Sequence, residues 1–232
     1  MKISVVIPVY NEQKYIADCL DSLVNQEEKP DEIIVVDNNC NDKTVEICKK
    51  YPVRIVREEM PGIIAARNAG FNAAEHEIIA RCDADGFAPP DWIRKIKENF
   101  AKNPIVALGG PLALYDLPFK SLSLKTTFFS NAYSYATKKI YKNHVLMGAN
   151  MALKKTTWDQ IKDKAAIKDN HVHEDVDITM LIGKIGEIGF DKKLIMATSA
   201  RRIKRKPHSF FVQYPVRMLK TYRRHSKKAD NE

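Results

Sequence analysis

Two aspartates, Asp83 and Asp85, follow directly after the apolar run at residues 77–82. Two carboxylates at this spacing in an extended turn can converge on one hard divalent cation. Mg²⁺ or Mn²⁺ held in this way keeps positions open for water and substrate phosphates. A solvated surface turn is the alternative, because Asp and Gly are common turn residues. The position after a predicted buried strand favours the cation site.

Two further charged residues have positions that suit ligand binding. Asp37 ends a predicted buried strand, where its carboxylate can accept hydrogen bonds from a nucleobase N–H or from ribose hydroxyls; a helix cap is the alternative, although Asn41 or Asp42 would serve that purpose better. Arg67 falls in the first turns of a predicted helix, where a cation opposes the helix dipole. An anionic ligand would explain this cation, and a surface salt bridge is the alternative.

Glu174 and Asp175 open a predicted helix after a turn that contains His171 and His173. Acidic residues are favoured at a helix N-terminus, so capping is one explanation of this pair. The functional explanation is a general base that takes a proton from an attacking hydroxyl. A zinc site is not expected, because such sites need three or four ligands and no further pair has suitable spacing.

The first half of the chain predicts the elements that must position these residues. Short apolar runs alternate with amphipathic helical patterns, which indicates a parallel sheet covered by helices on both faces. Ligands of such sheets bind beyond the carboxyl ends of the strands, so the polar loops at residues 9–12, 37–42 and 83–86 should share one edge. The predicted strands cover residues 3–8, 32–37, 53–56, 77–82 and 105–108, and the predicted helices cover residues 12–25, 42–50, 63–74 and 92–101.

The second half is less regular. Residues 119–141 are rich in aromatic side chains and fit a helix, and a further helix is predicted at 175–185. Residues 146–153 predict a strand that Gly148, Ala149 and Asn150 interrupt, and another strand is predicted at 194–197.

The composition is that of an ordinary globular protein, with 44% hydrophobic and 29% charged residues in 232. Four cysteines form no Cys-x-x-Cys pair, which is typical of reduced thiols in a cytoplasmic protein. The N-terminal apolar run is too short for a signal peptide, and no run of about 18 apolar residues predicts a membrane span.

The net charge of +9 comes from the C-terminus. Residues 201–232 contain 11 Lys and Arg against 2 Asp and Glu, so residues 1–200 carry 27 of each sign. Residues 201–225 interleave basic with aromatic and aliphatic side chains, which suits an anionic membrane surface. A solvated terminus and a nucleic-acid arm are the alternatives, and no nucleic acid is expected. Pro207 and Pro215 predict two short helical segments in this tail rather than one. We therefore expect a catalytic domain at 1–200 followed by a basic amphipathic tail at 201–232.

Six segments of the chain, in this order, resemble the family 2 glycosyltransferases, which are inverting enzymes of the GT-A fold. The segments are SVVIPVYNE, VVDNNCNDKT, PGIIAARNAG, CDADG, GANMALKK and HEDVDITMLIGKIG, and together they span residues 3–189. The resemblance implies a three-layer α/β fold with a mainly parallel central sheet, and a Mn²⁺ or Mg²⁺ ion held by the Asp-x-Asp pair. By this resemblance the residues that bind the nucleotide-sugar donor are Pro8, Val9, Tyr10, Glu12, Asp37, Arg67, Asp83, Ala84 and Asp85.

The resemblance also implies roles for residues later in the chain. Asp175 matches the catalytic base of the family, and Glu174 lies beside it near the acceptor. Asn150 falls in the segment that faces the donor sugar or the acceptor, and Arg202 matches a late arginine that contacts the diphosphate in some members. Residues 38–40, Asn-Asn-Cys, depart from the small residues that are usual there, which puts the details of base contact in doubt.

The implied function is metal-dependent, inverting transfer of a sugar from a UDP-sugar, or a GDP-sugar, to a hydroxyl of a glycan or lipid-linked acceptor. Such an enzyme would act at the inner face of the cell membrane in cell-envelope glycan synthesis. Transfer to a polyprenyl phosphate is one alternative. A nucleotidyltransferase is another, but it typically has a glycine-rich basic loop after the first strand, which residues 9–12 lack. A non-enzymatic adaptor is disfavoured because Asp37, Asp83, Asp85 and Asp175 are all present.

Overall fold

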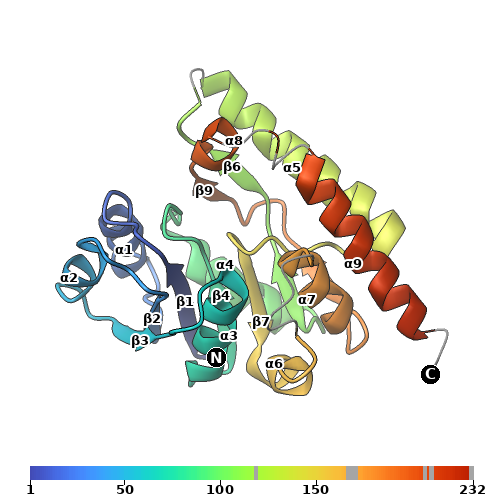
Figure 1. Ribbon diagram of the computed structural model, residues 1–232, viewed down its shortest axis with the longest axis horizontal. Helices are drawn as coiled ribbons and strands as arrows, with labels where there is room; N and C mark the ends of the chain where they lie inside the picture. Colours follow the sequence, from blue (N-terminus) through green and yellow to red (C-terminus); the bar gives the residue numbers. More distant parts are fainter. Residues whose placement is uncertain (118–119, 166–171, 206–207, 209–211, 230–232) are drawn as a thin grey trace.

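A seven-stranded sheet forms the centre of the protein, whose computed structural model describes residues 1–117, 120–165, 172–205, 208 and 212–229 (Figure 1). The strand order is β3-β2-β1-β4-β7-β5-β8. Only β7 runs antiparallel to its neighbours β4 and β5, so the sheet is mainly parallel, as predicted. The strands are β1 (Ile3–Val9), β2 (Glu32–Asp37), β3 (Arg54–Arg57), β4 (Ile78–Arg81), β5 (Ala107–Gly109), β7 (Met151–Lys154) and β8 (Ile188–Phe190).

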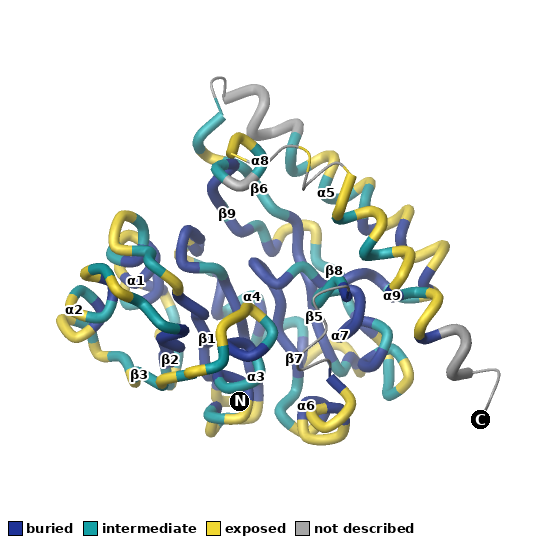
Figure 2. The backbone as a smooth tube through the Cα atoms, viewed as in Figure 1, coloured by how far each residue is buried: buried dark blue, intermediate teal, exposed yellow. Residues whose placement is uncertain are grey.

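Helices cover both faces of this sheet, because successive side chains of the central strands point to opposite sides and both sets are apolar. Val5 and Ile7 of β1 belong to one buried cluster, whereas Val6 belongs to the other. The first cluster includes side chains from α1 (Ile16–Val24), α2 (Thr44–Cys48) and α4 (Trp92–Lys102); the second includes side chains from α3 (Ile63–Ala73), α6 (Lys155–Ile161) and α7 (Glu174–Ile182). The result is the predicted three-layer α/β architecture, with the buried strands between the helical layers (Figure 2).

Gly70 sets the distance between α3 and the sheet. A Cβ atom at this position would lie 2.3 Å from the Cγ1 atom of Val6 and 2.9 Å from the Cγ2 atom of Val36. Only glycine allows the helix to pack this closely on β1 and β2. The close packing carries Arg67, one turn earlier on α3, into the interior, where it is 0% exposed.

A small second sheet brings the C-terminal part of the chain to the loop after β4. It pairs β6 (Leu112–Leu114) with β9 (Met196–Thr198) in parallel, and Ala197 also forms a bridge with Phe87. The helix α8 (Arg201–Arg205) begins directly after this sheet. Residues 198–201 therefore lie beside the Asp83–Asp85 turn, although more than 100 positions separate them in the sequence.

Two long helices, α5 (Lys120–Tyr141) and α9 (Tyr214–Ala229), lie side by side along one edge of the molecule (Figure 1). The predicted helix at 119–141 is confirmed as α5. In the described part of the tail α8 and α9 are two helices, as predicted, but α9 has 16 residues rather than being short, and Pro215 lies within its first turn. No helix in the described ranges is long and apolar enough to cross a membrane. The predicted domain boundary at residue 200 stays a prediction.

Candidate active site

The polar loops that follow β1, β2 and β4 meet at one edge of the sheet. The register pairs Val9 with Asp37, so the carboxyl ends of β1 and β2 are level. The turn of Asp83 and Asp85 begins two residues after β4, which pairs with β1 on the other side. Parallel neighbouring strands thus bring together the loops that the sequence predicted to form one site.

Asp37 is 6% exposed and occupies the end of β2. Its Oδ1 atom accepts a 2.8 Å hydrogen bond from the backbone N–H of Cys40, and its Oδ2 atom lies 3.4 Å from Nη1 of Arg57. The unusual Asn38 has a structural role here. Its amide nitrogen donates to the backbone oxygens of residues 58 and 60, at 3.0 and 2.7 Å, and its oxygen accepts from the N–H of Gly62 at 2.8 Å. Asn38 therefore ties the site to the start of α3.

The predicted nucleoside-pocket residues after β1 differ in exposure. Pro8 and Val9 are both buried within the strand, and the side chain of Val9 belongs to the first buried cluster. Tyr10 is 61% exposed and is free to contact a ligand. Asn11 has a left-handed backbone conformation with φ of 57°, which turns the chain so that Glu12 points back toward Asp85.

Arg201 links Glu12 to the Asp-x-Asp turn. Its Nη2 atom lies 2.6 Å from Oε1 of Glu12, and its Nε atom lies 2.7 Å from Oδ2 of Asp85. The guanidinium also stacks over the ring of Tyr15 at 4.5 Å. Burial alone would lower the pKa of Arg201, but the two carboxylates outweigh it and raise the pKa above its ordinary value.

Asp116 holds the start of α8 in the position that this pairing requires. Its two oxygens accept hydrogen bonds from the hydroxyl of Ser199, at 2.8 Å, and from the backbone N–H of Ala200, at 2.6 Å. The resemblance pointed to Arg202 as the late arginine of the site; the structure places Arg201 there, and the side chain of Arg202 lies outside the described residues. Neighbouring arginines in one helix give no sequence signal that separates them, because only the helix phase decides which one faces the turn.

A second cluster lies between Asp83 and α7, and it centres on Glu174. The Oε1 atom of Glu174 lies 3.0 Å from Nη2 of Arg81, and its Oε2 atom lies 3.3 Å from Nη1 of Arg81 and 3.4 Å from Nη1 of Arg67. Arg81 also reaches Oδ1 of Asp83 at 3.4 Å. Both arginines are buried, at 0% and 2% exposed, so Glu174 and Asp83 supply the charges that allow two guanidiniums to leave water.

The pKa values in this cluster follow from its charges. Burial pushes the pKa of Glu174 upward, but Arg81 and Arg67 outweigh burial and hold it below its ordinary value. Burial lowers the pKa of Arg67, whereas Arg81 keeps a raised pKa because Glu174 and Asp83 oppose the effect of burial.

Arg81, at the end of β4, was not predicted from the sequence as a site residue. A lone cation in an otherwise apolar strand was the available signal, because such a cation needs a buried counter-charge.

Asp175 lies beside this cluster in the first turn of α7, and its pKa is shifted in the opposite direction from that of Glu174. Burial raises its pKa, and the neighbouring charge of Glu174 raises it further. Its Oδ1 atom is buried and has no hydrogen-bond partner among the described residues. A carboxylate with a raised pKa and an unpartnered oxygen is suited to accept a proton.

Asn150 does not face the site. It is 0% exposed, its Oδ1 atom accepts a 2.9 Å hydrogen bond from the indole N–H of Trp92, and its Nδ2 atom donates to the backbone oxygens of Pro111 and Leu194 at 3.1 and 2.6 Å. The expected contact of Asn150 with the sugar or the acceptor is not supported by this packing, because both ends of the amide are occupied within the fold. Ala84 is likewise buried, at 3% exposed.

The two aspartates suit a divalent cation whose remaining ligands come from the substrate and from water. Their carboxylates are the hard oxygen donors that Mg²⁺ and Mn²⁺ prefer. The side chain of Asp83 is 23% exposed, whereas Asp85 is 9% exposed and pairs with Arg201 and the hydroxyl of Thr198. Within the described ranges no three His, Cys, Asp or Glu residues gather around one point. A cation would therefore use this pair together with phosphate and water oxygens, and Arg201 would have to release one oxygen of Asp85.

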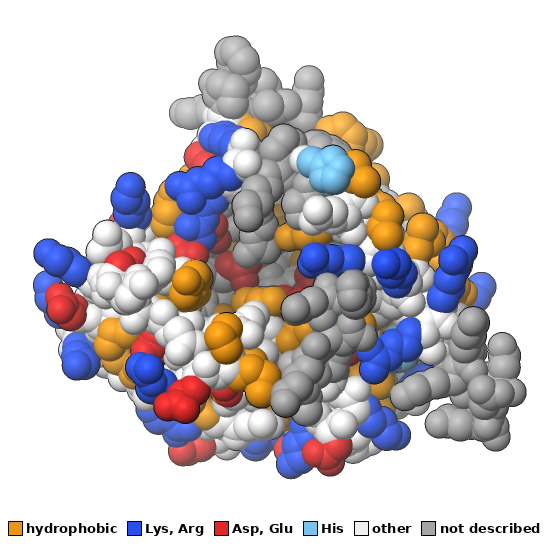
Figure 3. All heavy atoms as spheres, viewed as in Figure 1, with side chains coloured by type: hydrophobic (Ala, Val, Ile, Leu, Met, Phe, Trp, Pro, Cys, Tyr) orange, Lys and Arg blue, Asp and Glu red, His pale blue; other side chains and the backbone are white. Residues whose placement is uncertain are grey.

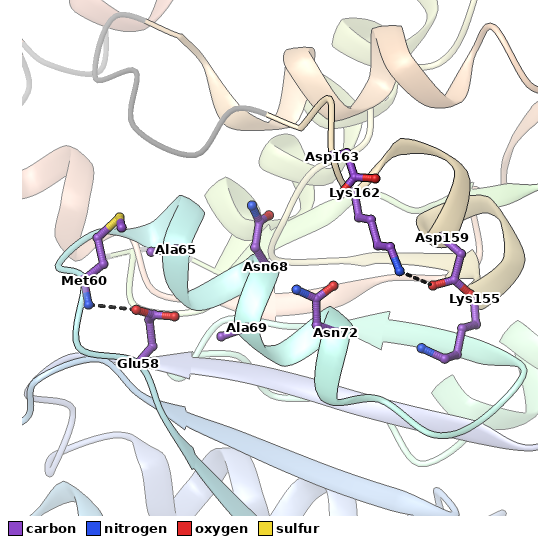
Figure 4. A pocket seen from close by; sticks show the side chains of 10 residues that line it. All are labelled: Glu58, Met60, Ala65, Asn68, Ala69, Asn72, Lys155, Asp159, Lys162 and Asp163. Carbon is purple, nitrogen blue, oxygen red and sulfur yellow. Dashed lines mark hydrogen bonds and ion pairs between the residues drawn. The ribbon is translucent and has the colours of Figure 1, made fainter.

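A groove of about 450 Å³ opens between α3 and α6, on one face of the sheet (Figure 4). Asn68 and Asn72 line it from α3, and each has its amide oxygen fixed by a donor on the protein side: Arg67 for Asn68, at 2.9 Å, and Trp158 for Asn72, at 2.8 Å. The amide N–H groups are left to face the groove. Through Asn68 the groove adjoins the buried arginine that pairs with Glu174.

Comparison with known proteins identifies the relatives of this chain. A family model described as Glycosyl transferase family 2 matches residues 4–160. GlyA, a glycosyltransferase of Streptococcus pneumoniae, is 34% identical over 106 residues, which are 44% of this chain and 15% of GlyA. A dolichol-phosphate mannosyltransferase of Pyrococcus furiosus is 33% identical over 115 residues, which are 47% of this chain and 33% of that protein. The chain thus matches less than half of the length of either relative.

Solved structures resemble the fold over most of the chain. Residues 1–349 of TarS from Staphylococcus aureus, in complex with UDP-GlcNAc, align with a TM-score of 0.66 and 20% identity, covering 86% of this chain and 58% of that one. Glucosyl-3-phosphoglycerate synthase from Mycobacterium tuberculosis, in complex with Mn²⁺, UDP and phosphoglyceric acid, aligns with a TM-score of 0.65 and 16% identity, covering 97% and 78%. At these identities the likeness shows the fold alone.

Proposed function

The chain belongs to glycosyltransferase family 2, and from this membership we propose that it transfers a sugar from a nucleotide-sugar donor to an acceptor hydroxyl with inversion. The family and the GT-A fold confirm the resemblance predicted from the sequence. The observation that carries the proposal is the meeting of three acidic elements at one edge of the sheet: Asp37, the pair Asp83 and Asp85, and Asp175. Each suits a different part of the reaction.

The donor side of the site is formed by the loops after β1, β2 and β4. We assign to Asp37 the hydrogen bonds from the nucleobase or ribose, and the exposed ring of Tyr10 in the neighbouring loop supports this assignment. A UDP-sugar is the favoured donor, and a GDP-sugar is the alternative. UDP is the nucleotide in the structures of TarS and of glucosyl-3-phosphoglycerate synthase that share this fold. Arg67, which the resemblance assigned to the donor, is buried against Glu174 and would act through that contact.

The leaving nucleoside diphosphate is an anion, and its charge must be balanced as the glycosidic bond breaks. Asp83 and Asp85 would hold a Mn²⁺ or Mg²⁺ ion, which would supply positive charge to balance that of the leaving phosphates. Mn²⁺ is present in the structure of glucosyl-3-phosphoglycerate synthase. Among the residues of this chain, Arg201 already lies at the same turn, where its guanidinium is held between Glu12 and Asp85. It is placed to contribute a second positive charge once a diphosphate competes for it.

Asp175 acts as the base in this proposal. Its raised pKa makes it a stronger base than an ordinary Asp, and it takes the proton of the acceptor hydroxyl as that oxygen attacks the anomeric carbon. The attack and the departure of the diphosphate occur on opposite faces of the sugar. A single displacement of this kind inverts the configuration and needs no covalent intermediate.

A polyprenyl phosphate is the second candidate acceptor, and the likeness to the dolichol-phosphate mannosyltransferase of P. furiosus favours it. A phosphate acceptor is already an anion and needs no base, so the two candidates differ in their need for Asp175. For either acceptor we propose action at an anionic membrane surface, on the cytoplasmic side, in the synthesis of cell-envelope glycans. The segment at 201–225 supports this, because it contains nine Lys and Arg and no Asp or Glu.

A donor screen tests the proposal. The purified protein is incubated with radiolabelled UDP- and GDP-sugars, with Mn²⁺ or with a chelator, and the slow hydrolysis of the donor is followed by chromatography. We expect hydrolysis of one donor that depends on Mn²⁺ or Mg²⁺ and is lost when Asp83 and Asp85 are both changed to Asn. If no nucleotide-sugar is bound or hydrolysed under any condition, the proposed function is wrong.

A further inference from the structure

The helices α5 and α9 form one structural unit. They run parallel, and they contact each other at two levels. The hydroxyl of Tyr133 lies 3.6 Å from the sulfur of Met218, and the rings of Tyr141 and Tyr222 meet edge to face with centroids 5.3 Å apart. The two helices lie along one edge of the molecule (Figure 1). Tyr135 of α5 meets the ring of Phe190 in β8, the last strand of the central sheet.

The outer side of this pair exposes an unusual amount of apolar surface. Twelve large hydrophobic side chains are exposed in the described part of the chain, and seven of them belong to α5 or to residues 212–219. Phe128 and Phe129 are the most exposed, at 69% and 65%. The other five are Tyr135, Ile140, Val212, Val216 and Leu219. Of the seven, Tyr135 is partly covered, because its ring packs against those of His144 and Phe190.

The same two helices carry charge of one sign only. The sequence of α5 contains four lysines, that of α9 contains six lysines and arginines, and neither contains Asp or Glu. Hydrophobic and basic side chains gather over these helices on the face shown in Figure 3. The surface therefore combines exposed apolar side chains with basic ones, of which six have described side chains: Lys138, Lys139, Arg217, Lys220, Arg223 and Arg224.

We propose that α5 and α9 together form a docking surface for an anionic lipid bilayer. The inference rests on the membrane site of action proposed above, and it adds α5, with its exposed Phe128 and Phe129, as half of the surface. The apolar side chains reach the headgroup and acyl boundary, and the lysines and arginines meet the anionic headgroups. Each cation in contact with such a surface strengthens binding about fivefold, the factor that corresponds to ~1 kcal/mol.

Two other partners fit the surface less well. Single-stranded nucleic acid would match the cations and the phenylalanines, but Ile140, Val216 and Leu219 offer no ring on which a base can stack. A second copy of this chain would match the apolar side chains, but a symmetric contact would bring two positively charged surfaces together. A bilayer matches both the aliphatic side chains and the cations.

The surface is connected to the catalytic side of the protein through α7. The hydroxyl of Thr221 in α9 accepts a 2.9 Å hydrogen bond from the backbone N–H of His173, and His225 Nε2 lies 2.8 Å from Oδ1 of Asp177. His173 and Asp177 flank Asp175, the proposed base. The helix that faces the bilayer thus fixes the turn that faces the acceptor, which suits an acceptor carried on a lipid.

Vesicle binding tests the inference without any donor or acceptor. The full-length protein is sedimented with vesicles of phosphatidylglycerol and phosphatidylcholine in equal parts, and with vesicles of phosphatidylcholine alone. We expect binding to the anionic vesicles only. The double variant Phe128→Ser, Phe129→Ser and the variant Lys139→Glu should each lower the partition coefficient by about fivefold or more. The matched controls Phe87→Ser, at a half-exposed phenylalanine elsewhere, and Lys102→Glu, on α4, should bind as the wild type does.

Several outcomes would overturn the inference: no binding of the wild type to anionic vesicles, or equal binding by α5 variants and controls. Two further outcomes would show that the surface binds a different partner. The first is a shift from dimer to monomer in the α5 variants by sedimentation velocity, and the second is competition by single-stranded RNA that those variants abolish. Circular dichroism and thermal melting show whether each variant is folded. Nucleotide-sugar binding by the same samples separates the two proposals, because failed vesicle binding with intact donor binding contradicts only the docking surface.

Discussion

Glu174 is the residue whose replacement tests the electrostatic description of the site most sharply. It is the carboxylate shared by Arg67 and Arg81, which are 0% and 2% exposed. In Glu174→Gln the side chain keeps its shape and one hydrogen-bonding oxygen but loses its charge. Arg81 then keeps only the 3.4 Å contact with Asp83, and Arg67 keeps only neutral partners within 3.5 Å.

The expected loss of stability is large because the arginines cannot move into water without unpacking the core. Removing one partner of a buried ion pair costs about 3–5 kcal/mol, and we expect the lower end, about 3 kcal/mol, because Gln still accepts a hydrogen bond. For a chain of this size the melting temperature should fall by roughly 6–12 °C. The pKa of Glu174 is held below its ordinary value, so its stabilising effect is complete above that value and is lost as the pH falls through the lowered pKa. The gap between wild type and variant should therefore narrow only in acid.

Urea denaturation followed by circular dichroism measures this difference, at neutral pH and in acid. The matched control is Glu98→Gln, which removes a 42% exposed carboxylate paired with Arg94 and Lys102 on α4. Solvent screens that exposed pair, so we expect no measurable change in the control. If Glu174→Gln is no less stable than Glu98→Gln, or if the gap does not depend on pH, the description of the buried cluster is wrong.

Three further substitutions test the site. Asp175→Asn should lower turnover with a hydroxyl acceptor by about 10²–10⁴-fold, while its donor affinity in calorimetry stays unchanged. The turnover of the wild type should rise with pH through a pKa above that of an ordinary Asp. Unchanged turnover in the variant would favour a phosphate acceptor. Asn150→Ala should destabilise the fold by at least about 2 kcal/mol in urea, because it strands the indole N–H of Trp92 and two carbonyls; a neutral effect would contradict that bonding. Arg201→Ala frees one oxygen of Asp85, so Mn²⁺ should raise the melting temperature of the variant more than that of the wild type, and equal shifts would count against this competition.

The sequence predicts the sheet and its ligand edge well, for a physical reason. The strands β1, β2 and β4 are buried on both faces, so they are continuous apolar runs, and the polar residues where they end stand out. The strands β6 and β8 were not predicted; β8 contains Gly189, and a glycine weakens the apolar pattern by which a strand is recognised. The helix α6 was also missed, because it follows β7 with no intervening loop.

The side-chain partners within the site could not be predicted. Asn150 lies in a segment that resembles a ligand-facing one, but Trp92 and Leu194 occupy its amide, and they are 58 and 44 positions away in the sequence. Arg201 reaches Glu12 over 189 positions. Such contacts depend on how β9 and α8 dock on the sheet. The types and spacing of nearby residues carry no information about that docking.

Donor binding by isothermal titration calorimetry tests the central claim most directly, because it needs no knowledge of the acceptor. The wild type and the double variant Asp83→Asn, Asp85→Asn are titrated with UDP-glucose, UDP-GlcNAc and GDP-mannose, with and without Mn²⁺. We predict that the wild type binds at least one of these donors, or its nucleoside diphosphate, more tightly with Mn²⁺, and that the double variant loses the Mn²⁺-dependent part. Absence of nucleotide binding in the folded wild type, or binding that is the same in the double variant, would contradict the assignment of this edge of the sheet as a nucleotide-sugar site.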